Sequence, residues 1–459
     1  MMRSVITAVA AALMLVTAPV PASAAPEMGW SPCPRPQAAK YHAECASLVT
    51  RGVTLALLRI PATEASQGPV FADSQETDGY GGSQIDFFLQ HGDHYLARLP
   101  QTHRTHDIVL VDPRGLGAST PVRCPLSAHD PAVPEFPATP TDTEQITRHG
   151  ASVYLRCAAA TGPLIAHSGL AEQADDLEAV RMALGAPRLD FLGQATGAEL
   201  GVVYAARHPA HTGRMALDTA VDPFLPAAQR VLDTARAEEA AFNRFAAWCD
   251  QTPEQCPVAG QDMGAVLDEL GIRGVPGLTG DEVRIAVGQF LLGYPFAWPG
   301  LAQALHDGNA SDFAPYVALT YTEPDYTASR AQTCTDHPSD PGRLAALARQ
   351  VRAAAPHTGG VSLQWDALQS CTGWPFGPAL ADRLPGHVFP ASPVLVTATA
   401  DDPINPSAWA ADLGARIAGS HVVIAPVDGH GALDNAPCAA GAIDTYLADG
   451  TLPSTEDCH

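Results

Sequence analysis

Nucleophilic catalysis needs a nucleophile, a base and an acid, and three segments of this 459-residue chain could bring such groups together. The segment FLGQATGAELG (191–201) has the frame of a nucleophile elbow, the G-x-S-x-G turn between a strand and a helix. Gly193 and Gly197 stand where that turn needs small residues, but Ala195 occupies the nucleophile position. An alanine methyl group cannot attack a carbonyl carbon. The segment is therefore an elbow without its nucleophile or a chance run of small residues.

The candidate acid and base come late in the chain, each shortly after an apolar run. Asp402 follows the run PVLVTATA, and His430 follows the run HVVIAP. The order of elbow, acid and histidine is that of the catalytic triad in α/β hydrolases. Because loops after parallel strands meet at the carboxyl edge of a sheet, we expect Asp402 to hydrogen-bond His430 and His430 to face the Cβ of Ala195. Asp401 and Asp428 are the competing carboxylates.

The elements expected around these residues alternate between strand and helix. Apolar or alternating runs predict strands over 52–61, 69–72, 107–111, 189–192, 215–218, 393–403 and 421–426. Helical periodicity predicts one helix from Ser168, as its N-cap, to Gly185, and a second helix that ends before Pro209. This alternation predicts an α/β protein with a mostly parallel sheet. The order of elbow, acid and histidine, each after a strand, predicts the α/β-hydrolase fold.

The alternation stops between about 223 and 385, where the sequence is alanine-rich and helical in pattern. A helical insertion between the middle and last strands of a sheet is typical of a lid. We therefore divide the chain into a signal peptide at 1–24, a first part of the hydrolase core at 25–222, a helical lid at 223–385, and the C-terminal part of the core at 386–459.

The N-terminus indicates export. Arg3 precedes an apolar run over 5–16, and the tripeptide ASA at 22–24 has the small-x-small pattern of a cleavage site. The apolar run is too short to span a bilayer. We expect cleavage after Ala24 and a secreted, soluble mature protein.

The ten cysteines all follow the predicted signal peptide, and an even count in an exported chain indicates disulfides. None of them forms C-x-x-C, which disfavours a zinc knuckle or a thioredoxin motif. Pairing between neighbours is the simplest arrangement, because each bridge then closes a short or moderate loop. It predicts the bridges Cys33–Cys45, Cys124–Cys157, Cys249–Cys256, Cys334–Cys371 and Cys438–Cys458.

Composition limits the partners of the protein. The formal charge is −23 and Lys40 is the only lysine, so nucleic acids and anionic membranes are disfavoured. The histidine-rich stretches HGDH (91–94) and HRTHD (103–107) lack the i, i+4 spacing of a helical metal site. The sequence contains no Walker loop or dinucleotide fingerprint. We therefore expect a monomer that acts on a peptide or small molecule without a metal or another cofactor.

Four segments carry a family resemblance: DIVLVDPRGLGASTPVRC (107–124), ADDLEAVRMALG (174–185) with the elbow after it, SPVLVTATADDPINP (392–406) and VDGHGALDNAPC (427–438). Through them the sequence resembles the secreted tripeptidyl aminopeptidases of actinobacteria, α/β hydrolases with a C-terminal TAP-like segment. The resemblance extends over nearly all of the expected mature chain. It implies exopeptidase chemistry with Asp402 as the acid and His430 as the base, and it supports the bridges 334–371 and 438–458.

The chain departs from that family at the nucleophile and in the oxyanion loop. The family has serine where this chain has Ala195, and a loop of the type N-P-G-G-P-G-G-S-G where this chain reads ETDGYGGSQ (76–84). Asp78 and Tyr80 replace small or rigid residues, and a carboxylate near a developing oxyanion is unfavourable. The candidate oxyanion donors are the backbone N–H groups of Thr196, Gly79, Gly81 and Gly82.

Loss of a triad serine typically lowers turnover about 10⁶-fold, which closes the ordinary acyl-enzyme route. Thr196 is a poor substitute, because the residue after the nucleophile offers its backbone N–H and points its side chain elsewhere. Three interpretations follow. Ala195 is a change introduced into a working peptidase, or the protein is a pseudoenzyme that binds ligands, or Asp402 and His430 act as a base without covalent catalysis, in a lyase, cyclase or water-activating reaction. The altered oxyanion loop counts against the first, and the intact pair favours the third over the second.

Acidic residues of the expected lid could bind the free amine of a peptide, as an aminopeptidase requires. Glu323, Asp325 and Asp336 are the candidates for this role. Because an acidic chain carries many surface carboxylates, their role depends on where the lid places them.

Overall fold

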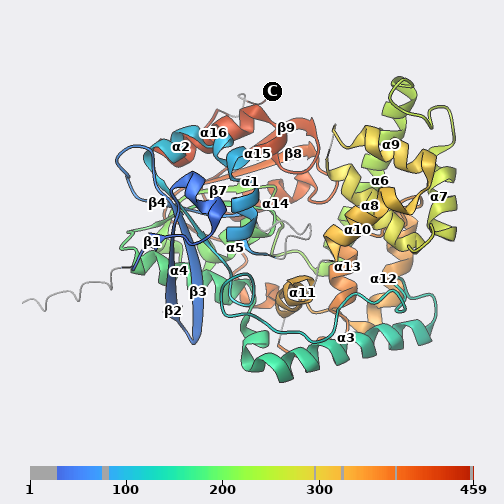
Figure 1. Ribbon diagram of the computed structural model, residues 1–459, viewed down its shortest axis with the longest axis horizontal. Helices are drawn as coiled ribbons and strands as arrows, with labels where there is room; N and C mark the ends of the chain where they lie inside the picture. Colours follow the sequence, from blue (N-terminus) through green and yellow to red (C-terminus); the bar gives the residue numbers. More distant parts are fainter. Residues whose placement is uncertain are drawn as a thin grey trace, which may run out of the picture.

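A sheet with a parallel centre forms the middle of the α/β part of the protein (Figure 1). The structure is a computed structural model that describes residues 28–74, 82–293, 296–321, 325–377, 380–454 and 458. The predicted signal peptide lies outside the described residues. The strands of the described residues pair in the order β1-β2-β3-β5-β4-β6-β7-β8-β9.

Antiparallel pairs form one side of the sheet and parallel pairs form the rest. The antiparallel side consists of β1 (Ser31–Pro32), β2 (Glu44–Thr50) and β3 (Val53–Ile60), and β3 also pairs antiparallel with β5. The parallel part consists of β4 (Pro69–Asp73), β5 (Asp107–Val111), β6 (Leu189–Gln194), β7 (Thr212–Asp218), β8 (Val394–Asp401) and β9 (Ser420–Asp428). The predicted α/β class with a mostly parallel sheet is therefore confirmed.

Two hydrophobic cores lie on the two faces of the sheet, because successive side chains of a strand point to opposite faces. On one face, strand residues such as Phe71 and Phe191 pack with α4 (Leu170–Ala183), α5 (Thr196–Arg207) and α14 (Ser407–Arg416). On the other face, neighbours such as Ala72 and Leu192 pack with α1 (Gln84–Arg98), α15 (Ala432–Asn435) and α16 (Pro437–Asp449). A short helix, α2 (Pro100–Thr105), follows α1.

The lid, defined here as helices α6 to α13, occupies the chain between β7 and β8 (Figure 1). Its helices are α6 (Ala227–Gln251), α7 (Met263–Arg273), α8 (Gly280–Leu292), α9 (Trp298–Asp307), α10 (Ala310–Thr320), α11 (Asp325–Asp336), α12 (Pro341–Ala354) and α13 (Leu363–Ser370). Part of the lid has its own core around Phe242, Phe245 and Phe290. No described helix, in the lid or elsewhere, is long and apolar enough to cross a membrane.

One long helix before the lid, α3 (Pro140–Thr161), was absent from the sequence expectations. It packs against α12 and α13, so the lid rests on chain that precedes β6 (Figure 1). Its start carries a local signal, because Thr139 and Asp142 form a capping box and Pro140 is the first helical residue.

The start of α4 corrects a sequence prediction. Ser168 was expected as the N-cap, but the N-cap is Gly169, and the Ser168 hydroxyl donates to the Ile165 carbonyl instead. The N–H of Leu170 is satisfied from the lid, because it donates to the Asp336 carboxyl at 2.7 Å. Asp336, which is distant in sequence, thus accepts an N–H of the first turn of α4, the capping role that the sequence predicted for Ser168.

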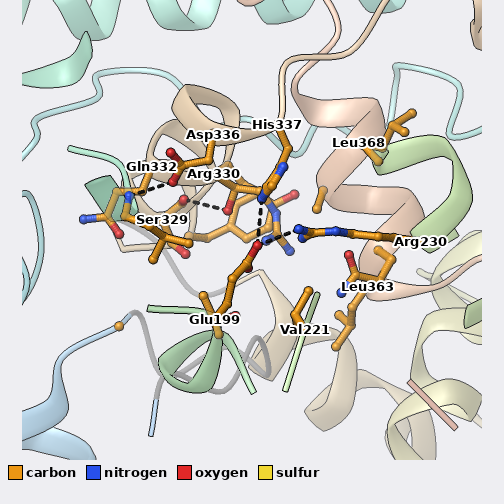
Figure 2. Close-up of a pocket in the computed structure, with 18 of the residues that line it drawn as sticks. Glu199, Val221, Arg230, Ser329, Arg330, Gln332, Asp336, His337, Leu363 and Leu368 are labelled. Carbon is orange, nitrogen blue, oxygen red and sulfur yellow. Dashed lines mark hydrogen bonds and ion pairs between the residues drawn. The ribbon is translucent and has the colours of Figure 1, made fainter. Parts of the chain in front are cut away.

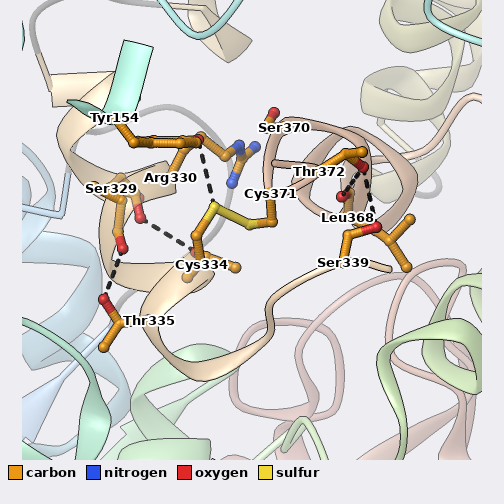
Figure 3. The surroundings of a disulfide bond; sticks show 12 residues. Tyr154, Ser329, Arg330, Cys334, Thr335, Ser339, Leu368, Ser370, Cys371 and Thr372 are labelled. Atoms are coloured by element: carbon orange, nitrogen blue, oxygen red, sulfur yellow. Dashed lines mark hydrogen bonds between the residues drawn. A yellow bond between two sulfur atoms is a disulfide. The ribbon is translucent and has the colours of Figure 1, made fainter. Parts of the chain in front are cut away.

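The structure contains five disulfides, and they are the five pairs that the sequence predicts. The bridge Cys334–Cys371 joins the last turn of α11 to the end of α13, with the Tyr154 hydroxyl 3.4 Å from the Cys334 sulfur (Figure 3). This bridge therefore braces the end of α11, where Asp336 lies.

Loop length should decide how much each lid bridge stabilises the protein. Cys334–Cys371 spans 37 residues and Cys249–Cys256 spans 7. We expect Cys334→Ala/Cys371→Ala to lower the free energy of unfolding by about 4 kcal/mol and Cys249→Ala/Cys256→Ala by about 2 kcal/mol. Chemical denaturation of both variants measures this difference. Equal losses, or free thiols in the unmodified protein by peptide mapping, would contradict the assignment.

Candidate active site

The turn between β6 and α5 has strained backbone geometry. Ala195 has φ 48° and ψ −114° and is 1% exposed. A residue other than glycine with positive φ is uncommon and is held only when its surroundings fix it. Here the Ala195 N–H donates to the Asp218 carbonyl at 3.0 Å, and the Ala195 carbonyl accepts from the Glu199 N–H at 3.1 Å. This is the sharp strand-to-helix turn that an elbow requires.

Two glycines permit that turn because of close backbone contacts. A Cβ at Gly193 would lie 2.5 Å from the Gly197 carbonyl oxygen, and a Cβ at Gly197 would lie 2.2 Å from the Asp73 carbonyl oxygen. Neither contact leaves room for a side chain. The small residues of the segment are therefore required by packing and are not a chance run.

Asp402 and His430 form the pair expected from their order in the chain. His430 Nδ1 lies 2.9 Å from Asp402 Oδ2 and 3.0 Å from Oδ1. Asp402 is buried and also accepts hydrogen bonds from the N–H groups of Ile404 and Asn405 and from the Thr219 hydroxyl. Burial alone would raise the pKa of Asp402, but the charge and hydrogen bond of His430 and the other donors lower it. The carboxylate is therefore ionised, and Nδ1 carries the proton between the two groups.

The two competing carboxylates bind a lid arginine instead of His430. Arg244 of α6 donates from Nε to Asp428 at 2.5 Å, and its other nitrogens lie 3.5 Å from the Asp401 carboxylate and 3.1 Å from the Asp401 carbonyl. Asp401 and Asp428 thereby attach the lid to the loops that carry Asp402 and His430.

Asp218, at the end of β7, connects the elbow to the histidine loop. Its carbonyl accepts the Ala195 N–H, and its carboxyl accepts the Thr397 hydroxyl at 2.6 Å and the Leu433 N–H at 3.0 Å. Burial raises the pKa of Asp218 to about 6. The close approach of the His430 ring to the Ala195 methyl group stays a prediction.

A cavity of about 90 Å³ lies beside the elbow, between the core and the lid. We call it the lid cavity; Gly82 and Thr196 line it on the core side, and residues of α6, α11 and α13 line it on the lid side. Its acidic and basic residues are Glu199, Arg230, Arg330, Asp336 and His337 (Figure 2).

Glu199 is the centre of a buried polar cluster in the lid cavity. It lies 2.5 Å from Arg230 and 3.2 Å from His337 Nε2, and Figure 2 shows both side chains pointing at it. Burial alone would raise the pKa of Glu199, but the charge of Arg230 and the hydrogen bonds from both partners outweigh burial and lower it to about 2. Burial and the nearby Arg230 lower the pKa of His337. The cluster at neutral pH is therefore an ionised pair with a neutral imidazole.

Only part of the sequence-predicted binding set is found at this cavity. Thr196, Gly82 and Asp336 line it, and Asp325 begins α11. Asp78, Gly79, Tyr80, Gly81 and Glu323 lie outside the described residues. The sequence reasoning did not find Glu199, Arg230, Arg330 or His337. Glu199 alone had a local signal, because it lies one helical turn after Ala195.

The elbow packing predicts a strong effect from a single methyl group. Gly197→Ala should lower the free energy of unfolding by about 2 to 3 kcal/mol, because its Cβ would overlap the Asp73 carbonyl. Gly441→Ala in α16 is the matched control, because nothing lies within 4 Å of its Cβ, and it should be neutral or stabilising by up to about 1 kcal/mol. Urea denaturation compares the two, and a neutral Gly197→Ala would show that the elbow is not packed as described.

Comparisons with known proteins agree with this geometry. A family model described as alpha/beta hydrolase fold matches residues 82–272, and one described as TAP-like protein matches residues 358–458. The chain is 28% identical to serine protease Hip1 of Mycobacterium tuberculosis over 438 residues, covering 87% of this chain and 82% of that protein. Carboxylesterase B of the same organism is also 28% identical, with coverage of 87% and 81%.

Tripeptidyl aminopeptidase of Streptomyces lividans is 26% identical over 381 residues, which cover 76% of this chain and 69% of that protein. The relatives and the family models together span both parts of the core and the lid. The chain thus has the α/β-hydrolase fold with a TAP-like segment in its C-terminal part, and it is similar to the tripeptidyl aminopeptidase of Streptomyces lividans.

Proposed function

We propose that this protein is an exported relative of the serine exopeptidases that binds a peptide or small acyl ligand in the lid cavity without forming an acyl-enzyme. The observation that carries the proposal is Ala195 at the strained turn between β6 and α5. The structure has the strained turn, the Asp402–His430 pair and the cavity, but the side chain at the turn has no nucleophilic atom.

The missing nucleophile affects one step of acyl transfer, the attack on the carbonyl carbon. In an acyl transfer the elbow side chain attacks the carbonyl, and the N–H after it stabilises the oxyanion. Thr196 is the first residue of α5, where backbone N–H groups have no partner within the helix, so it still offers this donor. The carbonyl of a bound ligand would therefore meet an oxyanion donor but no attacking group.

Export is the second part of the proposal. It rests on the predicted signal peptide and on the five disulfides of the described chain, which persist in an oxidising compartment.

Base catalysis without a covalent intermediate is a second candidate, and the Asp402–His430 pair favours it. An ionised, buried carboxylate on Nδ1 orients the imidazole and stabilises its protonated form, which a general base requires. A protein that only binds ligands has no need of that pair.

Restoring the hydroxyl tests the first proposal. The unmodified protein should show negligible hydrolysis of an unblocked tripeptide anilide, whereas Ala195→Ser should hydrolyse it measurably at high substrate concentration and react with a fluorophosphonate probe. The new hydroxyl would lie beside the base His430 and the Thr196 N–H.

Two controls make this test specific. Ala195→Ser/His430→Ala should lose the gained activity, because its serine has no base. Thr196→Ala, introduced without the serine, should hydrolyse the anilide as little as the unmodified protein does. Enzyme-like hydrolysis of the anilide by the unmodified protein, unaffected by His430→Ala, would contradict the assignment of the site.

A simple ester separates the two candidate functions. If His430 activates water, the unmodified protein should hydrolyse p-nitrophenyl acetate without a burst, and both His430→Ala and Asp402→Asn should slow it by about 10²- to 10⁴-fold. If the protein only binds ligands, the three proteins should hydrolyse the ester at the same background rate. Stopped-flow absorbance measures the rate and the burst together.

A further inference from the structure

The lid cavity differs in charge from the rest of the molecule. The chain has a formal charge of −23, yet the cavity is lined by two guanidinium groups, Arg230 and Arg330, and by one ionised carboxylate, Glu199. The second acidic group of the lining, Asp336, is 2% exposed. Burial raises the pKa of Asp336 to about 8, so this carboxyl is mostly protonated at neutral pH.

The carboxylates around the cavity already have partners within the protein. Glu199 accepts from Arg230 and His337. Asp336 accepts the Leu170 N–H at 2.7 Å and lies 3.4 Å from Arg383. Asp366 forms an ion pair with Arg330 at 2.7 Å. It also accepts a hydrogen bond from the Tyr326 hydroxyl at 2.8 Å. A ligand ammonium group would therefore have to displace a buried arginine contact or ionise Asp336.

Arg230 has unused capacity to donate hydrogen bonds. One of its terminal nitrogens donates both to Glu199 and to the Asp222 carbonyl at 2.8 Å, and its side chain is 4% exposed. Its Nε–H is buried and has no acceptor among the described residues. Figure 2 shows the guanidinium of Arg230 at the centre of the lining, opposite Glu199. A buried guanidinium with an unsatisfied donor favours an incoming anion.

We infer that the lid cavity takes its ligand through a carboxylate group, held by Arg230 beside the carboxyl of Asp336, and not through a free amine. This inference rests on the proposed binding function and assigns the ligand class for the same cavity. It reverses the role that the sequence gave to Asp336, because a neutral carboxyl donates to an anion and offers no charge to an ammonium group.

The carboxyl of Asp336 sets the sign of the pH dependence of ligand binding. The charged groups that face Asp336 are Glu172 on α4, Glu199 on α5 and Arg383 near the start of the C-terminal core, with the imidazole of His337 next in the chain. As the pH rises from 7 to 9, Asp336 loses its proton, so it stops donating and repels a ligand carboxylate. A peptide carboxylate does not titrate over this range. Affinity for it should therefore fall as the pH rises.

A matched pair of tripeptides tests the ligand class by isothermal titration calorimetry on the unmodified protein. One peptide is N-acetylated with a free C-terminal carboxylate, and the other has a free amine and a C-terminal amide. We expect the acetylated peptide to bind at least about tenfold more tightly than the amine peptide at pH 7. Its affinity should fall about tenfold between pH 7 and pH 9. Tighter binding of the amine peptide would overturn this inference and leave the proposed binding function standing. Failure of both peptides to bind would overturn both.

Three variants connect the result to the residues named. Asp336→Asn keeps a neutral group, so it should bind the acetylated peptide as before at pH 7 and show no weakening at pH 9. Arg230→Lys keeps the charge beside Glu199 but removes the planar guanidinium. It should therefore lower the affinity for the acetylated peptide about tenfold with little change in Tm. Arg236→Lys, on the exposed side of the same helix, should change neither the affinity for the acetylated peptide nor the Tm. A pH dependence that persists in Asp336→Asn would overturn the role of Asp336.

Discussion

The close backbone packing at the elbow is the constraint on which the rest of the site depends. Gly197 lies against the Asp73 carbonyl and Gly193 against the Gly197 carbonyl, so α5 starts at one position relative to the sheet. That position forces Ala195 into positive φ, whatever its side chain. The elbow can therefore keep its shape when the nucleophile is absent, because glycines at two other positions hold it.

The lid is attached to the same region by polar contacts, of which the Arg230–Glu199 ion pair is buried. Arg230 of α6 binds Glu199 on the elbow helix, Asp336 of α11 satisfies the first N–H of α4, and Arg244 binds the residues next to Asp402 and His430. A buried ion pair is costly to break, because either partner alone is a desolvated charge. The polar contacts that fix the lid over the core are thus also the groups that line or border the site.

The sequence predicted those parts of the structure that are encoded locally. Asp402 and His430 each follow an apolar run, and their order along the chain was enough to bring them to one edge of the sheet. The cluster of Glu199, Arg230 and His337 could not be found in this way, because its members come from α5, α6 and the end of α11 and meet only in the folded chain. Helix α3 has a capping signal at its start, whereas strand β2 has no fully buried residue and therefore no clear apolar pattern. Ser168 failed as an N-cap because Asp336, far away in the sequence, took that role.

The central claim is that this site binds a ligand and forms no covalent bond to it. A crystal structure of the unmodified protein soaked with an N-acetylated tripeptide that has a free carboxylate tests it most directly. The account predicts an intact, uncleaved peptide in the lid cavity, with its carboxylate on Arg230 and no bond to any side chain. An acyl group bonded to the protein, or cleaved peptide in the cavity, would contradict it.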